Sequence, residues 1–271
     1  MHIRYEPLTP KNLADVACCP GGAEVAGKTF RGNLEETIEW RHRMLDLGMR
    51  GIVAYDGSVP RGFVEYMPAE AAPVPIEAPG TAVLMCYHWA GTEPDDPEHL
   101  ERERELIAQV VERARGEVSG LVTQGWDVPT HFPIPLLQDL GFREVIRHGD
   151  IALMWLPYEE GNPEPRLAPA SYAPRDLSPD GLLAIDAAFT SRCPYSISTE
   201  ARLKEVISDH PLKDRIRVAL RRIDTREDAL AYAVAPFDWA WVFFNGEEVA
   251  LFEFPGEELA TEIARRIEAL S

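Results

Sequence analysis

Hydrophobic and polar positions alternate along the first half of the chain in a pattern that predicts strands separated by helices. Runs rich in β-branched and aromatic residues, bounded by turn residues, are typical of strands. The expected strands cover residues 3–9, 50–55, 61–67, 81–89 and 120–126, followed by a strand pair within residues 142–157. Because Asp56-Gly57 lies between the second run and the third, these two runs predict a β-hairpin.

Helices are expected between these strands. The first covers residues 33–48, with Asn33 as its N-cap, Glu36 at the capping-box position and Gly48 just past its end. A long helix starts near residue 96, and an irregular one lies within residues 132–141. The apolar side of the long helix is expected to consist of Leu100, Ile107, Val111 and Ala114.

The pattern changes after residue 157. Six prolines fall within residues 157–179, which predicts a stiff linker with little secondary structure. Residues 180–271 then show strands and helices in the order βαβαββα, which is typical of a small α/β module. No internal repeat relates the two halves.

The composition narrows the classes of function. A net charge of -18 argues against nucleic acid as a partner, because a polyanion is bound through clustered Lys and Arg. No run approaches the roughly 18 consecutive apolar residues of a membrane helix, and no signal-peptide pattern opens the chain, so a cytoplasmic protein that does not bind a membrane is expected. The four cysteines have no zinc-site spacing, so no metal is expected.

Three stretches of the first half resemble the GNAT superfamily of acyl-CoA N-acyltransferases. They are the hairpin RGIVAYDGSVPRGFVEYM, the strand VLMCYHW before a long helix, and PLLQDLGFREVIRHGDIALMWL, whose LGF looks like the family's turn into its closing strands. Within the second half, FTSRCPYS and WVFFNGEEV look similar to a YoaP-type, thioredoxin-like module that follows a GNAT domain in some bacterial proteins.

These resemblances imply the fold class and the domains. The expected class is α/β (α+β), with a GNAT-like mixed sheet and flanking helices followed by a small thioredoxin-like α/β domain. The GNAT-like domain covers residues 1–158, a Pro-rich linker covers 159–179, and the YoaP-type domain covers 180–271.

The resemblance to GNAT enzymes also implies acetyl-CoA as the cofactor. In that family a Gly-rich loop after the fourth strand offers backbone N–H groups to the pyrophosphate, and a splayed strand beside it binds pantetheine. The matching positions here are Cys86, Tyr87, Trp89, Gly91, Arg102 and Arg104. The chain departs from the family twice: residues 90–98 contain a single glycine, and Leu137 stands where a tyrosine acid is common.

The acidic residues of this loop have a structural interpretation too. Asp96 fits an N-cap, Pro97 the first helical position and Glu98 the first turn. Their charges would repel a pyrophosphate, at a cost of about 4 kcal/mol for two unit charges 4 Å apart at an effective dielectric of 20. The sequence leaves two alternatives: a self-capped helix, or a coenzyme site with the carboxylates turned outward and Arg102 or Arg104 at the phosphates.

Acyl transfer to an amine needs a base, an oxyanion donor and an oriented thioester. Glu65 and His88 are candidate bases, and Tyr87 is a candidate acid in place of the missing tyrosine. Cys86 is either an acyl-carrying nucleophile or a buried thiol. Trp126, Asp127 and His131 lie where the resemblance places the acceptor, and Asp127 and the acidic surface would favour a cationic small amine or peptide.

Cys193 lies between a strand and the start of a helix, a place that favours the thiolate form of cysteine. Ser196 stands where a second glutaredoxin-type cysteine can occur, so one-thiol chemistry is expected if Cys193 is reactive; otherwise it is a relic in a structural module. Three functions follow as hypotheses: a GNAT-type N-acetyltransferase, which could form a homodimer; a non-catalytic binding protein on the same scaffold; and a thiol redox protein.

Overall fold

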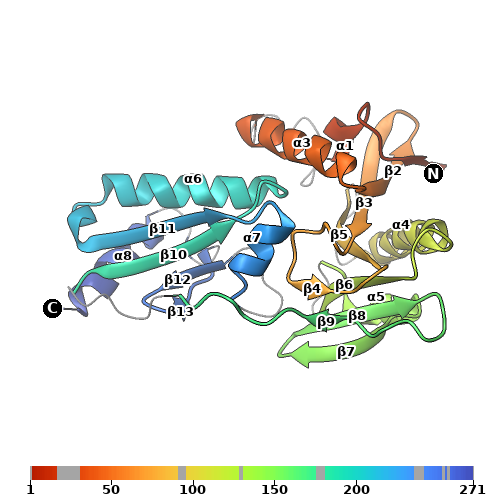
Figure 1. The fold of residues 1–271 in the computed structure, drawn as a ribbon. Helices are drawn as coiled ribbons and strands as arrows, with labels where there is room; N and C mark the ends of the chain where they lie inside the picture. The colour runs from red at the N-terminus through yellow and green to blue at the C-terminus, as the bar shows by residue number, and fades with distance from the viewer. Residues whose placement is uncertain are drawn as a thin grey trace.

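The computed structural model describes residues 2–16, 31–90, 96–127, 131–174, 181–234, 241–251, 254 and 257–270, with residues 31–33 described by their backbone only. Two main sheets organise these residues, one built from the first half of the chain and one from the second (Figure 1), and a third sheet consists of two short strands. The expected α/β (α+β) class, with a mixed sheet and flanking helices, is confirmed by this topology.

The larger sheet has seven strands in the order β1-β2-β3-β5-β6-β8-β7. The strands are β1 (Ile3–Pro7), β2 (Arg50–Asp56), β3 (Val59–Pro68), β5 (Ala82–Trp89), β6 (Gly120–Trp126), β7 (Arg143–His148) and β8 (Ile151–Pro157). All neighbours are antiparallel except β5 and β6 at the centre. The expected strands and hairpin are therefore present close to their predicted bounds.

Helices cover both faces of this sheet, because its central strands are apolar on both sides. On one face α1 (Leu13–Val16) and α3 (Arg31–Asp46) bury Leu13, Trp40 and Met44 against the strands. On the other face α4 (Pro97–Ala114) and α5 (Ile134–Asp139) do the same with Leu106, Val110 and Leu137. The helices thus form two separate apolar layers around the sheet.

Helix α3 starts earlier than its sequence signals indicate. The prediction that Asn33 is the N-cap is wrong, because the helix already begins at Arg31. The predicted end is correct: Gly48 has φ +92°, and Met49 N–H donates to the Met44 carbonyl. This left-handed residue is where glycine terminates a helix without strain.

The smaller sheet has the order β11-β10-β12-β13, with β10 (Leu183–Phe189) buried along its whole length. β10 is parallel to β11 (Ile216–Arg222) and antiparallel to β12 (Trp241–Phe244), which pairs with β13 (Glu247–Glu248). Its helices are α6 (Pro194–Asp209), the short η1 (Lys213–Arg215), α7 (Arg226–Ala231) and α8 (Glu258–Glu268). The predicted order βαβαββα is confirmed.

The chain between the two sheets is held against the first half. β9 (Arg166–Leu167) pairs with β4 (Ile76–Glu77), and Ala168 N–H donates to the Pro75 carbonyl. The Pro-rich segment is therefore anchored near its middle by backbone hydrogen bonds, which its composition did not predict.

Within the described part of the chain, the model contains no helix with the length and apolar character needed to cross a membrane.

Candidate active site

The centre of the larger sheet contains an interrupted parallel pair. β5 and β6 pair at two positions only, Ala82 with Leu121 and Val83 with Val122, although both strands continue for several residues and lie wholly within the described chain. On their outer sides both strands stay paired, β5 with β3 and β6 with β8. The inner edges beyond Val83 and Val122 therefore carry backbone groups that the sheet ladder does not use.

Two polar side chains of β6 lie at this interruption. The Thr123 hydroxyl donates to the Leu84 carbonyl at 3.1 Å, in the place of the next ladder bond. The side-chain amide nitrogen of the following residue, Gln124, is buried and has no hydrogen-bond partner among the described residues. A buried amide without a partner is costly, which is the state expected of a group that binds a ligand. Sequence reasoning missed Gln124, because a glutamine in a strand carries no motif.

Tyr87 points from β5 to the α4 side of the sheet. Its hydroxyl donates to Glu103 Oε2 at 3.4 Å, and its ring lies 4.5 Å from that of Phe132. Burial and the neighbouring Glu103 raise the pKa of Tyr87, so the phenol keeps its proton at neutral pH. Glu103 also contacts His99 Nε2 at 3.2 Å. The pair His99 and Glu103, four residues apart on α4, was hidden in the sequence among many surface carboxylates.

His88 is the next residue along β5. Burial lowers its pKa to about 4, with smaller contributions from His99 and His131. The imidazole is therefore neutral at pH 7 and can accept a proton, although weakly.

The start of α4 has the self-capped form that the sequence allowed. The Asp96 carboxylate accepts from Glu98 N–H at 2.8 Å, Pro97 has no N–H, and His99 N–H donates to the Asp96 carbonyl at 2.9 Å. The amides at the described start of the helix are thus used internally. Gly91, the predicted loop glycine, lies outside the described residues.

The predicted phosphate ligands on α4 have other partners. Arg102 pairs with Glu105 at 2.8 Å and with Glu98 at 3.3 Å, and Arg104 lies 3.5 Å from Glu101. These are neighbours along the helix surface, so both guanidinium groups are held by local carboxylates. The predicted apolar side of α4 needs one correction: Leu100 is 39% exposed, whereas Glu103 is buried.

Trp89 and the three predicted acceptor residues do not share one environment. Trp89 is buried among the α4-side residues, and Trp126 at the end of β6 is half-buried. Asp127 is exposed and pairs with Arg147 at 3.3 Å, so its carboxylate is already neutralised. His131 has φ +51° and is exposed, and it starts the turn that brings Phe132 onto Tyr87.

Glu65 lies on the opposite face from α4, in a buried ion pair. Both of its oxygens accept from Arg41 of α3, Oε2 from Nη2 at 3.0 Å and Oε1 from Nε. The two side chains are 0% and 2% exposed. Arg41 Nη1 also donates to the Arg192 carbonyl at 3.2 Å, which connects this pair to the second half of the chain.

Cys86 and Cys193 lie around this ion pair. Cys86 is the strand partner of Glu65 and packs into the α3-side apolar cluster, and Cys193 directly follows Arg192 as the N-cap of α6. Burial and Glu65 raise the pKa of the Cys86 thiol to about 12. Arg192 is 6% exposed and points Nη1 at the Met85 sulfur, 4.0 Å away. Arg41, Arg192 and their contacts join residues too far apart in sequence for any local motif to reveal.

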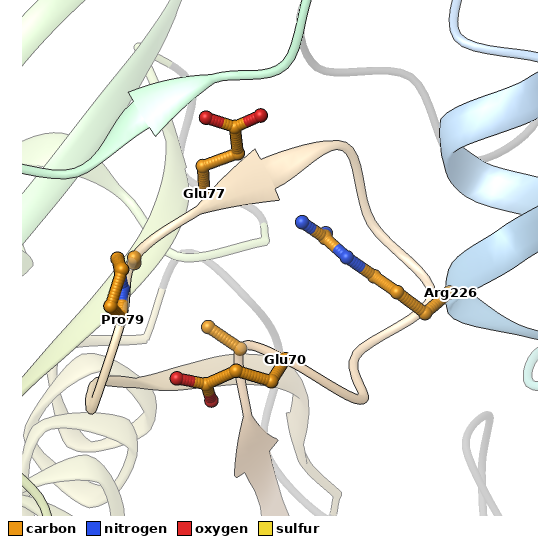
Figure 2. Close-up of a pocket in the computed structure, with 6 residues that line it drawn as sticks. Glu70, Glu77, Pro79 and Arg226 are labelled. Carbon is orange, nitrogen blue, oxygen red and sulfur yellow. The ribbon is translucent and has the colours of Figure 1, made fainter.

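Two of the hollows on the surface of the described residues lie away from the inner edges of β5 and β6. One, of about 220 Å³, lies between Glu70, strand β4 at Glu77 and the start of α7 at Arg226 (Figure 2). The other, of about 370 Å³, lies between β1 and α4 beside Arg102 and Arg104. No group of three or more His, Cys, Asp or Glu side chains suited to a metal occurs among the described residues.

No protein-family profile matches this chain, and no curated protein matches it. Solved structures resemble it. An acetyltransferase of the GNAT family from Brucella melitensis, in complex with acetyl-CoA, has 15% sequence identity and a TM-score of 0.40, and the match covers 63% of this chain and 97% of that one. Aminoglycoside 6′-acetyltransferase type Ii has 13% identity and a TM-score of 0.42, covering 59% and 98%. The PaiA N-acetyltransferase from Thermoplasma acidophilum, in complex with coenzyme A, has 15% identity and a TM-score of 0.38, covering 58% and 100%.

Proposed function

We propose that this protein is an N-acyltransferase that uses acetyl-CoA and acts on a small cationic amine or peptide. The observation that supports this most is the interrupted pairing of β5 and β6. Two strands whose inner edges lack a ladder offer donors and acceptors to an extended, amide-containing chain such as pantetheine, in the manner of an added strand. Acetyl-CoA, when bound, supplies a thioester whose carbonyl carbon accepts the amine.

The site fits the pantetheine end of acetyl-CoA better than the diphosphate end. At the pantetheine end, the open strand edges and the orphaned Gln124 amide suit an amide-rich ligand. At the diphosphate end, the amides at the described start of α4 are already used, with Asp96 adding negative charge. We therefore expect weak binding, with a dissociation constant on the order of 100 µM or more, or a free energy near -5 kcal/mol.

Each polar residue of the site has a proposed role. The Gln124 amide would donate to the acyl oxygen, as an oxyanion donor does. His88, neutral at pH 7, would take the proton of the ammonium group through water. Tyr87, which keeps its proton, would donate to the departing thiolate. Of the two candidate bases His88 is preferred to Glu65, because Arg41 binds both Glu65 oxygens.

The proposed acceptor is cationic because the net charge of -18 attracts cations to the protein. Asp127 contributes less to this preference than its sequence position suggested, because Arg147 already pairs with it. Trp126 and His131 stay proposed contacts of the acceptor.

The second half is proposed to be a thioredoxin-like accessory domain of residues 180–271, linked through residues 159–179 to a GNAT-like domain of residues 1–158. The strand order β11-β10-β12-β13 with α6 between two parallel strands supports this division. Cys193 at the start of α6 occupies the place of a redox thiol in such a domain.

Titration calorimetry with acetyl-CoA tests the proposed function directly. Heat of binding at millimolar ligand is expected, together with release of free thiol when polyamines or basic peptides are added. S-acetylpantetheine, which lacks the nucleotide, should bind with an affinity within about tenfold of acetyl-CoA, since little of the binding energy is expected from the diphosphate. No heat with either ligand would leave only a non-catalytic scaffold.

The negative charge of Asp96 at the N-cap of α4 is expected to weaken the binding of acetyl-CoA. Asp96→Asn keeps a side-chain oxygen for the Glu98 N–H but removes the negative charge. We expect acetyl-CoA to bind about tenfold more tightly to this variant, a gain of about 1.4 kcal/mol. Glu112→Gln, an exposed position near the other end of the same helix, is the matched control and should change the affinity less than twofold. An unchanged affinity in Asp96→Asn would mean that the diphosphate does not approach this helix start.

A further inference from the structure

We propose that Cys86 and Cys193 form a redox-responsive dithiol between the two halves of the chain, which closes to a disulfide when the protein meets a low-molecular-weight disulfide such as glutathione disulfide. The observations behind this dithiol do not depend on the acyl-transfer proposal, although Cys86 lies on β5, the strand whose inner edge that proposal uses.

Three contacts bring the two cysteines to one place. Arg192, the residue before Cys193, reaches the sulfur of Met85, the residue before Cys86, at 4.0 Å. Arg41 donates to the Arg192 carbonyl, whose carbon is bonded to the nitrogen of Cys193. The same guanidinium holds Glu65, which lies directly opposite Cys86 in the β3–β5 register.

Cys86 and Cys193 are both free thiols, and 107 positions of sequence separate them. Both are half-buried, and the groups that surround them are fully buried: Arg41, Glu65 and Arg192 are each no more than 6% exposed. A fixed, buried framework of this kind limits how far either cysteine can move from the other. A disulfide needs the two Cα atoms within about 7 Å of each other, and we infer that this framework holds Cys86 and Cys193 at such a separation.

The residues around each thiol indicate the order of reaction. Cys193 stands at the N-cap position of α6 and is half-buried. Tyr195, two residues later, is 47% exposed, and we infer that a small oxidant approaches from this side. Cys86 packs into the α3-side apolar cluster, and burial raises the pKa of its thiol to about 12, so this thiol is protonated at neutral pH. Cys193 is therefore the entry thiol and Cys86 the resolving thiol.

Cys193 Sγ, as thiolate, attacks one sulfur of glutathione disulfide, a mixed disulfide forms, and the first glutathione thiolate leaves. Cys86 Sγ then attacks Cys193 Sγ, and the second glutathione thiolate leaves. The two protons from the cysteines pass to the two glutathione molecules. The protein loses two electrons, and glutathione disulfide gains them.

Tryptic peptide mapping can test this, because the four cysteines fall in three peptides. Cys86 lies in residues 62–102, Cys193 in residues 193–202, and Cys18 and Cys19 in residues 12–28. The full-length protein is incubated for hours with millimolar glutathione disulfide, a time scale suited to buried thiols. Remaining thiols are blocked with N-ethylmaleimide, and the digest is analysed by mass spectrometry without reduction. We expect peptide 62–102 linked to peptide 193–202 as the predominant cross-linked species.

Two variants make the result decisive. Cys193→Ser should abolish the cross-link and leave Cys86 reacting at least tenfold more slowly with glutathione disulfide, whereas Cys18→Ser should leave the cross-link unchanged. Predominant links to peptide 12–28, or glutathione adducts on both Cys86 and Cys193 with no link between them, would overturn the proposal. Complete alkylation of both thiols after incubation would overturn it equally.

Discussion

Replacing Arg41 with methionine is expected to lower the free energy of unfolding by about 3–5 kcal/mol. Methionine keeps much of the apolar length of arginine but leaves the Glu65 carboxylate, which is fully buried, without its cation. Removing one partner of a buried pair costs far more than the pair contributes, because the remaining charge is neither solvated nor compensated. Urea unfolding followed by circular dichroism measures the change.

Two further variants separate this effect from loss of packing. Arg43→Met on the same helix is the matched control, because Arg43 is exposed and pairs loosely with Glu39 at 3.6 Å; a change below about 0.5 kcal/mol is expected. Arg41→Met combined with Glu65→Leu removes both charges and should recover most of the lost stability. If the double variant were as unstable as Arg41→Met, the cost would come from packing and not from the uncompensated carboxylate.

Acid should destabilise the protein through His88 between pH 6.5 and pH 4. The unfolded chain binds a proton at His88 as the pH falls through about 6.5, whereas the folded protein resists until about pH 4. The unfolded state therefore binds more protons in this window, and the free energy of unfolding falls as the pH is lowered. The total loss is about 3 kcal/mol and is complete below pH 4. Above pH 6.5 this contribution disappears.

The measurement is the difference in the free energy of unfolding between pH 7 and pH 4.5, compared between wild type and His88→Gln. Glutamine cannot titrate, so the acid-induced loss should be smaller in the variant by about 2–3 kcal/mol. His42→Gln, at an exposed position of α3, should keep the wild-type loss. Equal losses in wild type and His88→Gln would show that His88 is protonated as easily in the folded protein as in the unfolded one.

The local pattern of apolar and polar residues predicted the strands well where that pattern alone determines their bounds. The runs that became β5 and β6 were placed within a residue of their bounds, because a strand between two apolar layers needs a largely apolar sequence. The N-cap prediction at Asn33 was wrong because a capping residue marks only one possible start of a helix. The residues before it can extend the helix when tertiary packing allows.

The candidate site was only partly predictable. Tyr87, His88 and Cys86 were found because they end an apolar strand, and Asp96 because its capping pattern is local. Glu103, Gln124 and Arg41 could not be found in this way. Their roles depend on burial and on partners in other elements, and a single sequence does not separate a buried carboxylate or amide from the many exposed ones.

Trp40 shows how closely the two halves depend on each other. This side chain is completely buried in the first half, yet its indole nitrogen donates to the Asp224 carbonyl of the second half at 3.1 Å. A protein cut at the proline-rich segment would lose that acceptor and expose helix α3 where α6 now lies beside it (Figure 1). The two halves should therefore be produced, purified and inherited as one unit, and the gene is expected to tolerate fission poorly.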